Sequence, residues 1–352
     1  LVPYAEWMNG SVLLLHRSDY GCCNTLLAEQ VGMLGRYTEA FFPELVYVRP
    51  QGQIEKRDSL EGSAFIDFPV DQTMIYPDYR RNTAELGKIQ SSIDSVRNDT
   101  DITITSVWLK GYASPEGSYA HNKELAIGRT AALKRYIQQL YRFEGDVITT
   151  DYEPEDWAGL RYYVERSNLA HRAEIVTLID GNLEPDAKEW KIKRDYPMEY
   201  SFLLQNCYPA LRHTDYRIAY TIRSYSDVEE IKRIMCGRPQ KLDLNEFYLA
   251  AQEYEPGTDE FTEVFETAVR MFPDDTIANL NAANAAMRRG DLTSAKRYLA
   301  KADDSPEAVY ARGALAIRQK DYDSARRYLN EAKSLGLEQA GITLEQLEKG
   351  RR

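Results

Sequence analysis

One stretch of the chain combines residue types and spacing suited to binding an anion. It runs from Gly111 to Ser118, reads Gly-Tyr-Ala-Ser-Pro-Glu-Gly-Ser, and lies where a strand-like segment gives way to a helix-like one. A glycine-flanked loop at the start of a helix leaves backbone N–H groups without intrahelical partners, and those groups favour negative charge. Arg129 follows in the apolar row of the helix, between Leu125 and Leu133, so its guanidinium must find a partner or reach the surface.

No catalytic set accompanies this stretch. Ser114 lies in a Gly-x-x-Ser-x-x-Gly context, unlike the Gly-x-Ser-x-Gly turn of hydrolase nucleophiles, and only His121 is a nearby base in the sequence. The chain contains no Gly-x-x-x-x-Gly-Lys-Ser/Thr phosphate-binding loop. It has 4 His and 4 Cys, and the adjacent Cys22 and Cys23 lack the C-x-x-C spacing of zinc sites. We therefore predict a protein that is not an enzyme, with no catalytic residues, no cofactor and no metal site.

Composition and charge narrow the classes of partner. The chain has 352 residues, with 44 Lys plus Arg against 55 Asp plus Glu and a net charge of −11. Nucleic acids and anionic membranes both attract basic surfaces, so neither is expected as a partner. No apolar run approaches the ~20 residues that a transmembrane helix needs. Cys207 and Cys236 are either bridged, in an oxidising compartment, or buried free thiols, and the sequence leaves both alternatives open.

Around the Gly111 stretch, strand patterns alternate with helix patterns. Apolar residues recur every three or four positions in two segments, which predicts two amphipathic helices. The predicted order is strand 64–70, helix 82–96, strand 102–112, helix 118–141, strand 147–150, short helix 157–166 and a closing strand 216–222. We take residues 61–226 as one α+β domain in which the charged, helical residues 168–210 are an insertion.

This middle part resembles the peptidoglycan-associated domain of the outer-membrane protein A (OmpA) family. Gly111, Gly117, Asn122, Leu125 and Arg129 match that family's motif at its intervals. The β-α-β-α-β order with a closing strand is also similar to the family's domain. The resemblance implies a site that grips the zwitterionic diaminopimelate of the peptidoglycan stem peptide, with the helix arginine holding its carboxylate.

At one position the sequence departs from the family motif, because Ser114 stands where the family has a loop Asp. Glu116 would then supply the carboxylate, and Arg212 would stand in for the family's basic pair before the last strand. The resemblance therefore implies a ligand-binding set of Ser114, Glu116, Asn122, Arg129 and Arg212. The form Gly-Tyr-Ala-Ser-Pro-Glu-Gly, followed by helical repeats, is also similar to cell-envelope proteins of Bacteroidales. It implies a location in the periplasm or at the outer membrane.

An internal repeat distinguishes residues 243–352. The same pattern of large and small residues returns after 34 and then after a further 30 residues. The three sets are Phe261, Phe265 and Ala268, then Ala295, Leu299 and Ala302, then Ala325, Leu329 and Ala332. This pattern resembles tetratricopeptide repeats, with Leu344 and Leu347 in a capping helix. The resemblance implies stacked helix pairs that bind a protein or peptide in their concave face.

Two further segments complete the predicted organisation. Residues 1–60 read as β-rich, with strands at 11–15 and 44–48 and a helix from Thr25 to Tyr37. Because the chain begins Leu-Val-Pro-Tyr without an initiator Met, we expect this segment to be the tail of an upstream domain. Residues 227–242 are predicted to be a linker.

Together these features predict a non-enzymatic cell-envelope protein. Its OmpA-like module would contact peptidoglycan or an envelope partner, and its helical repeats would bind a protein or peptide. The alternative is a scaffold for surface-structure or outer-membrane assembly in which the OmpA-like pocket is vestigial.

Overall fold

The computed structural model divides the chain into two compact units. One unit is residues 54–224, and the other combines residues 1–53 with residues 225–352. The first unit is α+β around a four-stranded sheet, whereas the second contains a two-stranded hairpin and a run of helices. The predicted α+β class, followed by an all-helical C-terminal region, is thus confirmed at this level. The structure describes Met8 and residues 11–36, 41–53, 55–69, 71–143 and 146–349.

The sheet of the α+β unit has its closing strand in the middle. Its strands β3 (Lys56–Ala64), β4 (Ile102–Tyr112), β5 (Ile148–Glu153) and β6 (Thr214–Ile222) lie in the order β3-β6-β4-β5. Strand β6 is antiparallel to both neighbours, with Ile218 opposite Val107 of β4, and β4 is parallel to β5. The predicted closing strand is therefore confirmed, despite more than 100 intervening residues since β4.

The strand predicted at 64–70 is wrong, because the chain forms its strand earlier, at Lys56–Ala64. Residues 65–69 form neither strand nor helix, and Val70 lies outside the described residues. The backbone N–H groups of Phe65 and Asp67 donate instead to the side chains of Glu85 and Asn82. Those groups are therefore taken by a helix and are lost to the sheet ladder.

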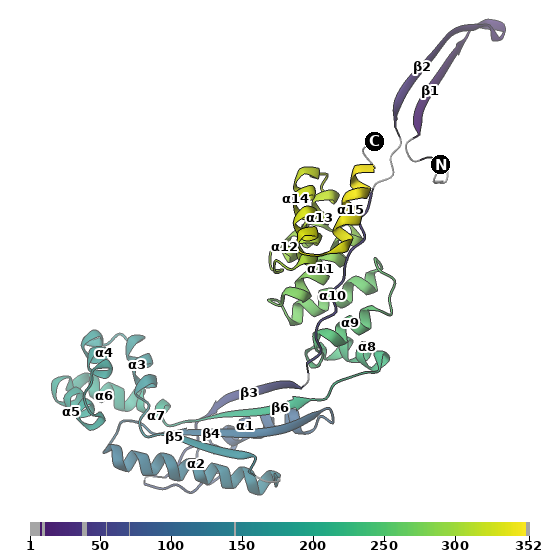
Figure 1. Ribbon diagram of the computed structural model, residues 1–352. Helices are drawn as coiled ribbons and strands as arrows, with labels where there is room; N and C mark the ends of the chain where they lie inside the picture. The colour runs from purple at the N-terminus through teal and green to yellow at the C-terminus, as the bar shows by residue number, and fades with distance from the viewer. Residues whose placement is uncertain are drawn as a thin grey trace. The chain divides into compact units, whose positions relative to one another are not determined.

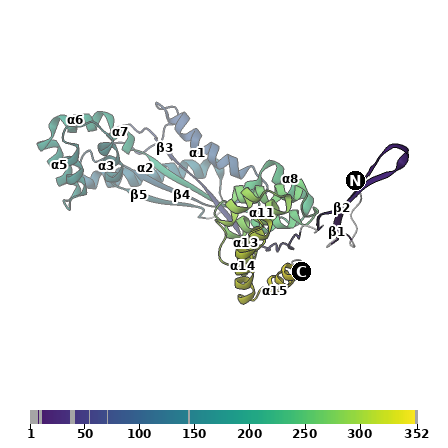
Figure 2. The ribbon, with the colours of Figure 1, turned by 90° about the horizontal axis from the view of Figure 1, so that it is seen from above.

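Helices α1 (Asn82–Arg97) and α2 (Tyr119–Tyr141) cover one face of this sheet (Figure 2). Val107, Leu109 and Ile218 point to that face and are fully buried. The period of two along the strands and of 3.6 along the helices places their apolar residues at this interface. The helices predicted at 82–96 and 118–141 are confirmed.

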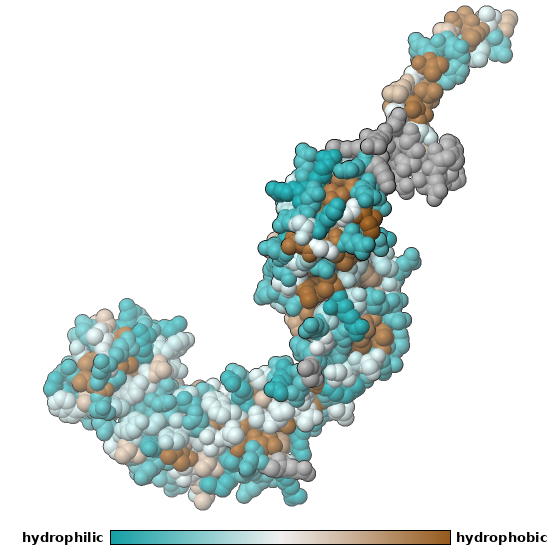
Figure 3. Space-filling model, in the orientation of Figure 1, coloured by the Kyte–Doolittle hydropathy of each residue, from teal (hydrophilic) through white to brown (hydrophobic). Residues whose placement is uncertain are grey.

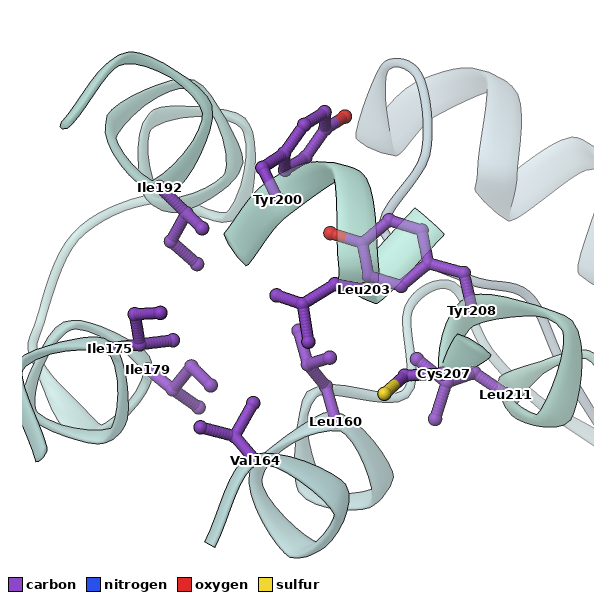
Figure 4. Packing of buried hydrophobic residues seen from close by; sticks show 10 residues of the cluster. All are labelled: Leu160, Val164, Ile175, Ile179, Ile192, Tyr200, Leu203, Cys207, Tyr208 and Leu211. Atoms are coloured by element: carbon purple, nitrogen blue, oxygen red, sulfur yellow. The ribbon is translucent and has the colours of Figure 1, made fainter. Parts of the chain in front are cut away.

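Five helices follow β5 and build a small core of their own. They are α3 (Trp157–Glu165), α4 (Arg172–Asp180), α5 (Pro185–Asp195), α6 (Pro197–Asn206) and α7 (Tyr208–Leu211). Their buried side chains converge in Figure 4, with Leu160, Ile175 and Leu203 fully enclosed. The predicted helical character of 168–210 is confirmed. Cys207 joins this core as a free thiol, whereas Cys236 is free and exposed in the other unit.

The first described part of the second unit is a β-hairpin. Strands β1 (Val12–Tyr20) and β2 (Leu26–Arg36) pair antiparallel around the short turn η2 (Cys22–Asn24). The helix predicted from Thr25 to Tyr37 is therefore wrong over β2, and Tyr37 lies outside the described residues. Leu, Ala, Glu, Gln and Met favour a helix intrinsically, but pairing with β1 overrides that preference. Apolar side chains of the hairpin, among them Leu27 and Met33, are exposed (Figure 3).

The remaining helices form what we call the helical array. They are α8 (Val228–Gly237), α9 (Leu244–Ala251), α10 (Asp259–Met271), α11 (Thr276–Arg289), α12 (Leu292–Leu299), α13 (Pro306–Arg318), α14 (Tyr322–Ser334) and α15 (Glu338–Lys349). Residues 227–242, predicted to be a linker, thus contain α8 and the 3-10 turn η3 (Pro239–Lys241). The small and large repeat positions Ala295, Leu299, Ala325 and Leu329 are all buried between helices.

Residues 41–53, which we call the extended segment, run along this helical array (Figure 1). The strand predicted at 44–48 is wrong, because the segment contains no strand or helix. Phe41, Leu45, Val46 and Val48 pack against the buried clusters of the array. An apolar run of this length indicates burial, but its partner here is a set of helices rather than a sheet.

The packing around Ala295 gives a direct test of the repeat. Ala295 is fully buried on α12, so Ala295→Trp should destabilise the helical array by about 1–3 kcal/mol through overpacking. Lys296→Trp introduces the same side chain one position later, where it is exposed, and should change stability little. Urea unfolding followed by circular dichroism measures both variants. Equal stability of the two would contradict the packing described.

Candidate functional site

The turn from β4 into α2 is built by two glycines with different roles. Gly111, the last but one residue of β4, packs against α2, where a Cβ atom would lie 1.9 Å from the Thr130 hydroxyl oxygen. Gly117 has a φ of +95°, a backbone conformation that other residues rarely adopt. Ser118 then caps α2, because its hydroxyl accepts a hydrogen bond from the His121 N–H. The glycines of the motif therefore serve close packing and backbone geometry.

Arg212, two residues before β6, contacts this turn. Its Nε donates to the Ser114 hydroxyl at 3.0 Å, and its guanidinium forms an ion pair with Glu116. Strand pairing brings them together, since Thr214 of β6 lies opposite Gly111 of β4. Three of the five predicted site residues thus converge, and the ion pair is only half buried.

Arg129 lies on α2 beside this cluster but does not contact Glu116. Its Nε donates to the Gln72 carbonyl at 3.4 Å, and its guanidinium lies 5.0 Å from the centre of the Phe68 ring. Gly128 lets the loop approach α2 here, because a Cβ atom at that position would lie 2.7 Å from a methyl carbon of Thr73. Among the described residues, no carboxylate forms an ion pair with this guanidinium.

Electrostatics distinguish Arg129 from an ordinary surface arginine. Burial lowers its pKa, and the nearby positive charge of Arg212 lowers the pKa further, against a smaller opposing effect of Asp71. Arginine remains charged despite such shifts. Two guanidiniums therefore repel each other across a site in which Glu116 neutralises only one of them. A bound carboxylate would relieve that repulsion and accept paired N–H bonds.

Asn122, the fifth predicted residue, points elsewhere. It is buried, and its amide donates to Glu155 at 2.9 Å. Glu155 also accepts a hydrogen bond from the Trp157 indole at 2.8 Å, and it is itself buried. Asn122 therefore ties α2 to the segment after β5. Glu155 is not among the site residues predicted from the sequence, although the acidic pair Glu155-Asp156, shortly after β5, is a visible signal.

The helical array carries a second candidate site that the repeat pattern alone did not reveal. Asn281 and Asn284 lie in the middle of α11, are almost fully buried, and hydrogen-bond to the backbone of the extended segment. Three asparagines within the Ala-rich α11 are the signal that was overlooked, since Asn disfavours helix interiors. The helical array therefore already holds an extended segment of its own chain through the Asn281 and Asn284 side chains.

Neither site has the features of a metal centre. Among the described residues, His, Cys, Asp and Glu side chains do not form any group of three or more suited to hold a metal ion. Within the same ranges, no helix combines the length and apolarity required to cross a bilayer. No protein-family model matches the chain, and comparison with curated proteins finds no match. What the two sites bind must be inferred from their own residues.

The buried Glu155 generates a pH-dependent prediction. Burial raises its pKa above the ordinary value of 4.5, so the folded state holds this proton more tightly than the unfolded state. The contribution of Glu155 to stability therefore falls as the pH rises from 4.5 through the raised pKa. Glu155→Gln does not titrate, so its stability relative to wild type should improve between about pH 4 and about pH 7.

Urea unfolding at the two pH values measures this difference. Glu124→Gln, which removes an exposed carboxylate from α2, is the control. If the stability of Glu155→Gln relative to wild type falls as the pH rises, burial does not disfavour the charged form of Glu155.

Proposed function

We propose that residues 54–224 form a non-enzymatic, OmpA-like binding module that holds the carboxylate of a cell-wall peptide at Arg129 and Arg212. The observation that carries this proposal is the position of the two guanidiniums beside the turn from Gly111 to Ser118, with Glu116 balancing one of them. A zwitterionic ligand such as diaminopimelate needs both a cation for its carboxylate and an anion for its amine. Arg129 supplies the first and Glu116 the second.

The order of elements supports the same proposal. Strands β3 to β6 and helices α1 and α2 follow the β-α-β-α-β order with a closing strand that resembles the OmpA family. The helical array, in turn, resembles tetratricopeptide repeats in its spacing of buried small and large residues. We therefore place the protein in the cell envelope, in the periplasm or at the outer membrane, with peptidoglycan as the partner of the α+β unit.

Sedimentation with insoluble peptidoglycan tests this function. Arg129→Ala should weaken binding at least tenfold, about 1.4 kcal/mol, because an arginine–carboxylate pair is lost. Arg212→Ala should also weaken binding, and it additionally leaves Glu116 without its ion-pair partner. Arg135→Ala removes an exposed arginine from the same helix and should bind like wild type.

The outcome also separates this function from its alternative. Binding by wild type and by Arg135→Ala, with loss in Arg129→Ala, supports the proposal. Equal sedimentation of all variants would place the contact elsewhere on the protein. Failure of wild type to sediment would remove peptidoglycan from the account.

The second candidate function is a scaffold for surface-structure or outer-membrane assembly, in which the Arg129 site is vestigial. One observation favours it: side chains of α11 and α13 already form hydrogen bonds with the main chain of residues 44 and 48. A helical array engaged in this way holds parts of its own chain together, as a scaffold does. The protein would then act through fixed contacts rather than through exchange of ligands.

A further inference from the structure

The extended segment forms no strand or helix, so the N–H and C=O groups of its main chain need hydrogen-bond partners outside the segment. Asn281 forms two hydrogen bonds with Val48: its Oδ1 accepts from the N–H at 2.9 Å and its Nδ2 donates to the carbonyl at 2.7 Å. Asn284 donates to the Val46 carbonyl at 2.7 Å, and the Tyr310 hydroxyl donates to the Glu44 carbonyl at 2.6 Å. Side chains of the helices therefore form the hydrogen bonds with this main chain that a neighbouring strand would form in a sheet.

These contacts follow the geometry of an extended chain. The carbonyls of residues 44, 46 and 48 are bonded in turn, and alternate residues of an extended chain face the same side. Their partners lie on α11 and α13, while α15 adds Gln339 at the Glu44 carboxylate and α9 adds Asn245 at Arg49. Helices α9, α11, α13 and α15 thus contribute hydrogen bonds, and α10 adds aromatic contacts through Phe261 and Phe265. We call the side formed by these five helices the receiving face.

Two aromatic side chains anchor the segment, Tyr47 within this run of hydrogen bonds and Phe42 just before it. The Tyr47 ring stacks on Phe265 at 5.5 Å between ring centres and meets the edge of Phe261 at 5.1 Å. Its hydroxyl is buried and has no hydrogen-bond partner among the described residues, so the ring supplies the attraction.

Phe42 is the other anchor. Its ring lies 5.2 Å from the guanidinium carbon of Arg288 and 4.7 Å from that of Arg318. These two arginines are 30 residues apart, which is the spacing of the sequence repeat. The receiving face therefore offers a repeated cation to an aromatic side chain, as well as the aromatic site for Tyr47.

The receiving face has the chemistry of a peptide receptor rather than of a plain core. A core would be packed with apolar side chains, yet α11 places two carboxamides where they bond only to the main chain of residues 46 and 48. Hydrogen bonds to the main chain hold an extended peptide whatever its sequence, and the aromatic sites give preference to peptides with aromatic side chains at the right positions. Burying such carboxamides without partners would be unfavourable.

We propose that the receiving face is a recognition site for an extended peptide with two aromatic anchors, and that residues 41–49 are its tethered ligand. The proposal goes beyond the function proposed above, because it concerns the helical array and is independent of the Arg129 site. A tether gives its ligand an effective concentration of about 1 mM, so a free peptide at lower concentration competes poorly. The chain therefore keeps this face closed to segments of other proteins.

Fluorescence anisotropy with a labelled synthetic peptide of residues 41–53 tests the proposal on the full chain. Wild type should bind this peptide weakly because its own segment occupies the face. The anchor variant Phe42→Ala with Tyr47→Ala should bind it at least about tenfold more tightly, since the face is open in a larger fraction of molecules. Adding Asn281→Ala and Asn284→Ala to that variant should abolish the gain.

Two controls make the test specific. Tyr47→Phe keeps the ring and loses only the unpartnered hydroxyl, so it should bind as weakly as wild type. A peptide that carries Ala in place of Phe42 and Tyr47, with Phe41 kept, should not bind the anchor variant. Binding of both peptides with equal affinity would contradict aromatic recognition.

Circular dichroism on the same samples decides the remaining outcomes. A folded anchor variant that fails to bind the peptide overturns the proposal, as does wild type binding as tightly as the anchor variant. Tyr47→Ala alone should give an intermediate affinity. If the anchor variant and Tyr47→Ala both lose the helical signal, the segment is part of the core of the array, and this result also overturns the proposal. A negative result here leaves the peptidoglycan test of Arg129 unaffected.

Discussion

Backbone N–H and C=O groups that leave water must find partners, and this constraint shapes both units. In the α+β unit it is met by β6, which enters between β3 and β4 and hydrogen-bonds to both along its length. Because Thr214 thereby lies opposite Gly111, the start of β6 brings Arg212 to the turn with Ser114 and Glu116. In the second unit Asn281 and Asn284 meet the same constraint for the extended segment.

The two candidate sites differ in how their charges and polar groups are balanced. At the turn, Glu116 pairs with Arg212, while Arg129 keeps its charge in a partly buried place near a like charge. That imbalance is what favours a carboxylate ligand. On the receiving face, both bonding groups of the Asn281 amide are satisfied by the main chain of Val48. In the proposed function the first site receives an external carboxylate, whereas the second already contacts residues 46 and 48 of the same chain.

Elements with a strong period could be predicted from the sequence. Strand β4 and helix α1 were found within a residue or so, because alternation and three-to-four spacing report which face is buried. The repeat positions Ala295 and Leu299 of α12 could be predicted because the same pattern of small and large residues returns along the chain. Each such pattern packs against a neighbouring helix. Strand β2 was missed, since its residues favour a helix and only the pairing with β1 decides otherwise.

Long-range partners and side-chain directions could not be predicted. The run at 44–48 is apolar enough for a strand, but its partners Asn281 and Tyr310 lie more than 200 residues away in the chain. Asn122 matches the OmpA-like motif, yet its amide bonds to Glu155, a residue outside that motif. Spacing along a helix fixes which residues share a face, but it does not fix which neighbouring loop each of them meets.

Binding of the extended segment's main chain by the helical array can be measured at one amide. Asn281 is the acceptor of the Val48 N–H, so hydrogen exchange of that group reports the contact. We expect slow exchange for this amide in wild type and fast exchange in Asn281→Ala, with the helices of the array still protected. Exchange of the Val48 amide in wild type at the rate of an unstructured peptide would show that the array does not hold this segment.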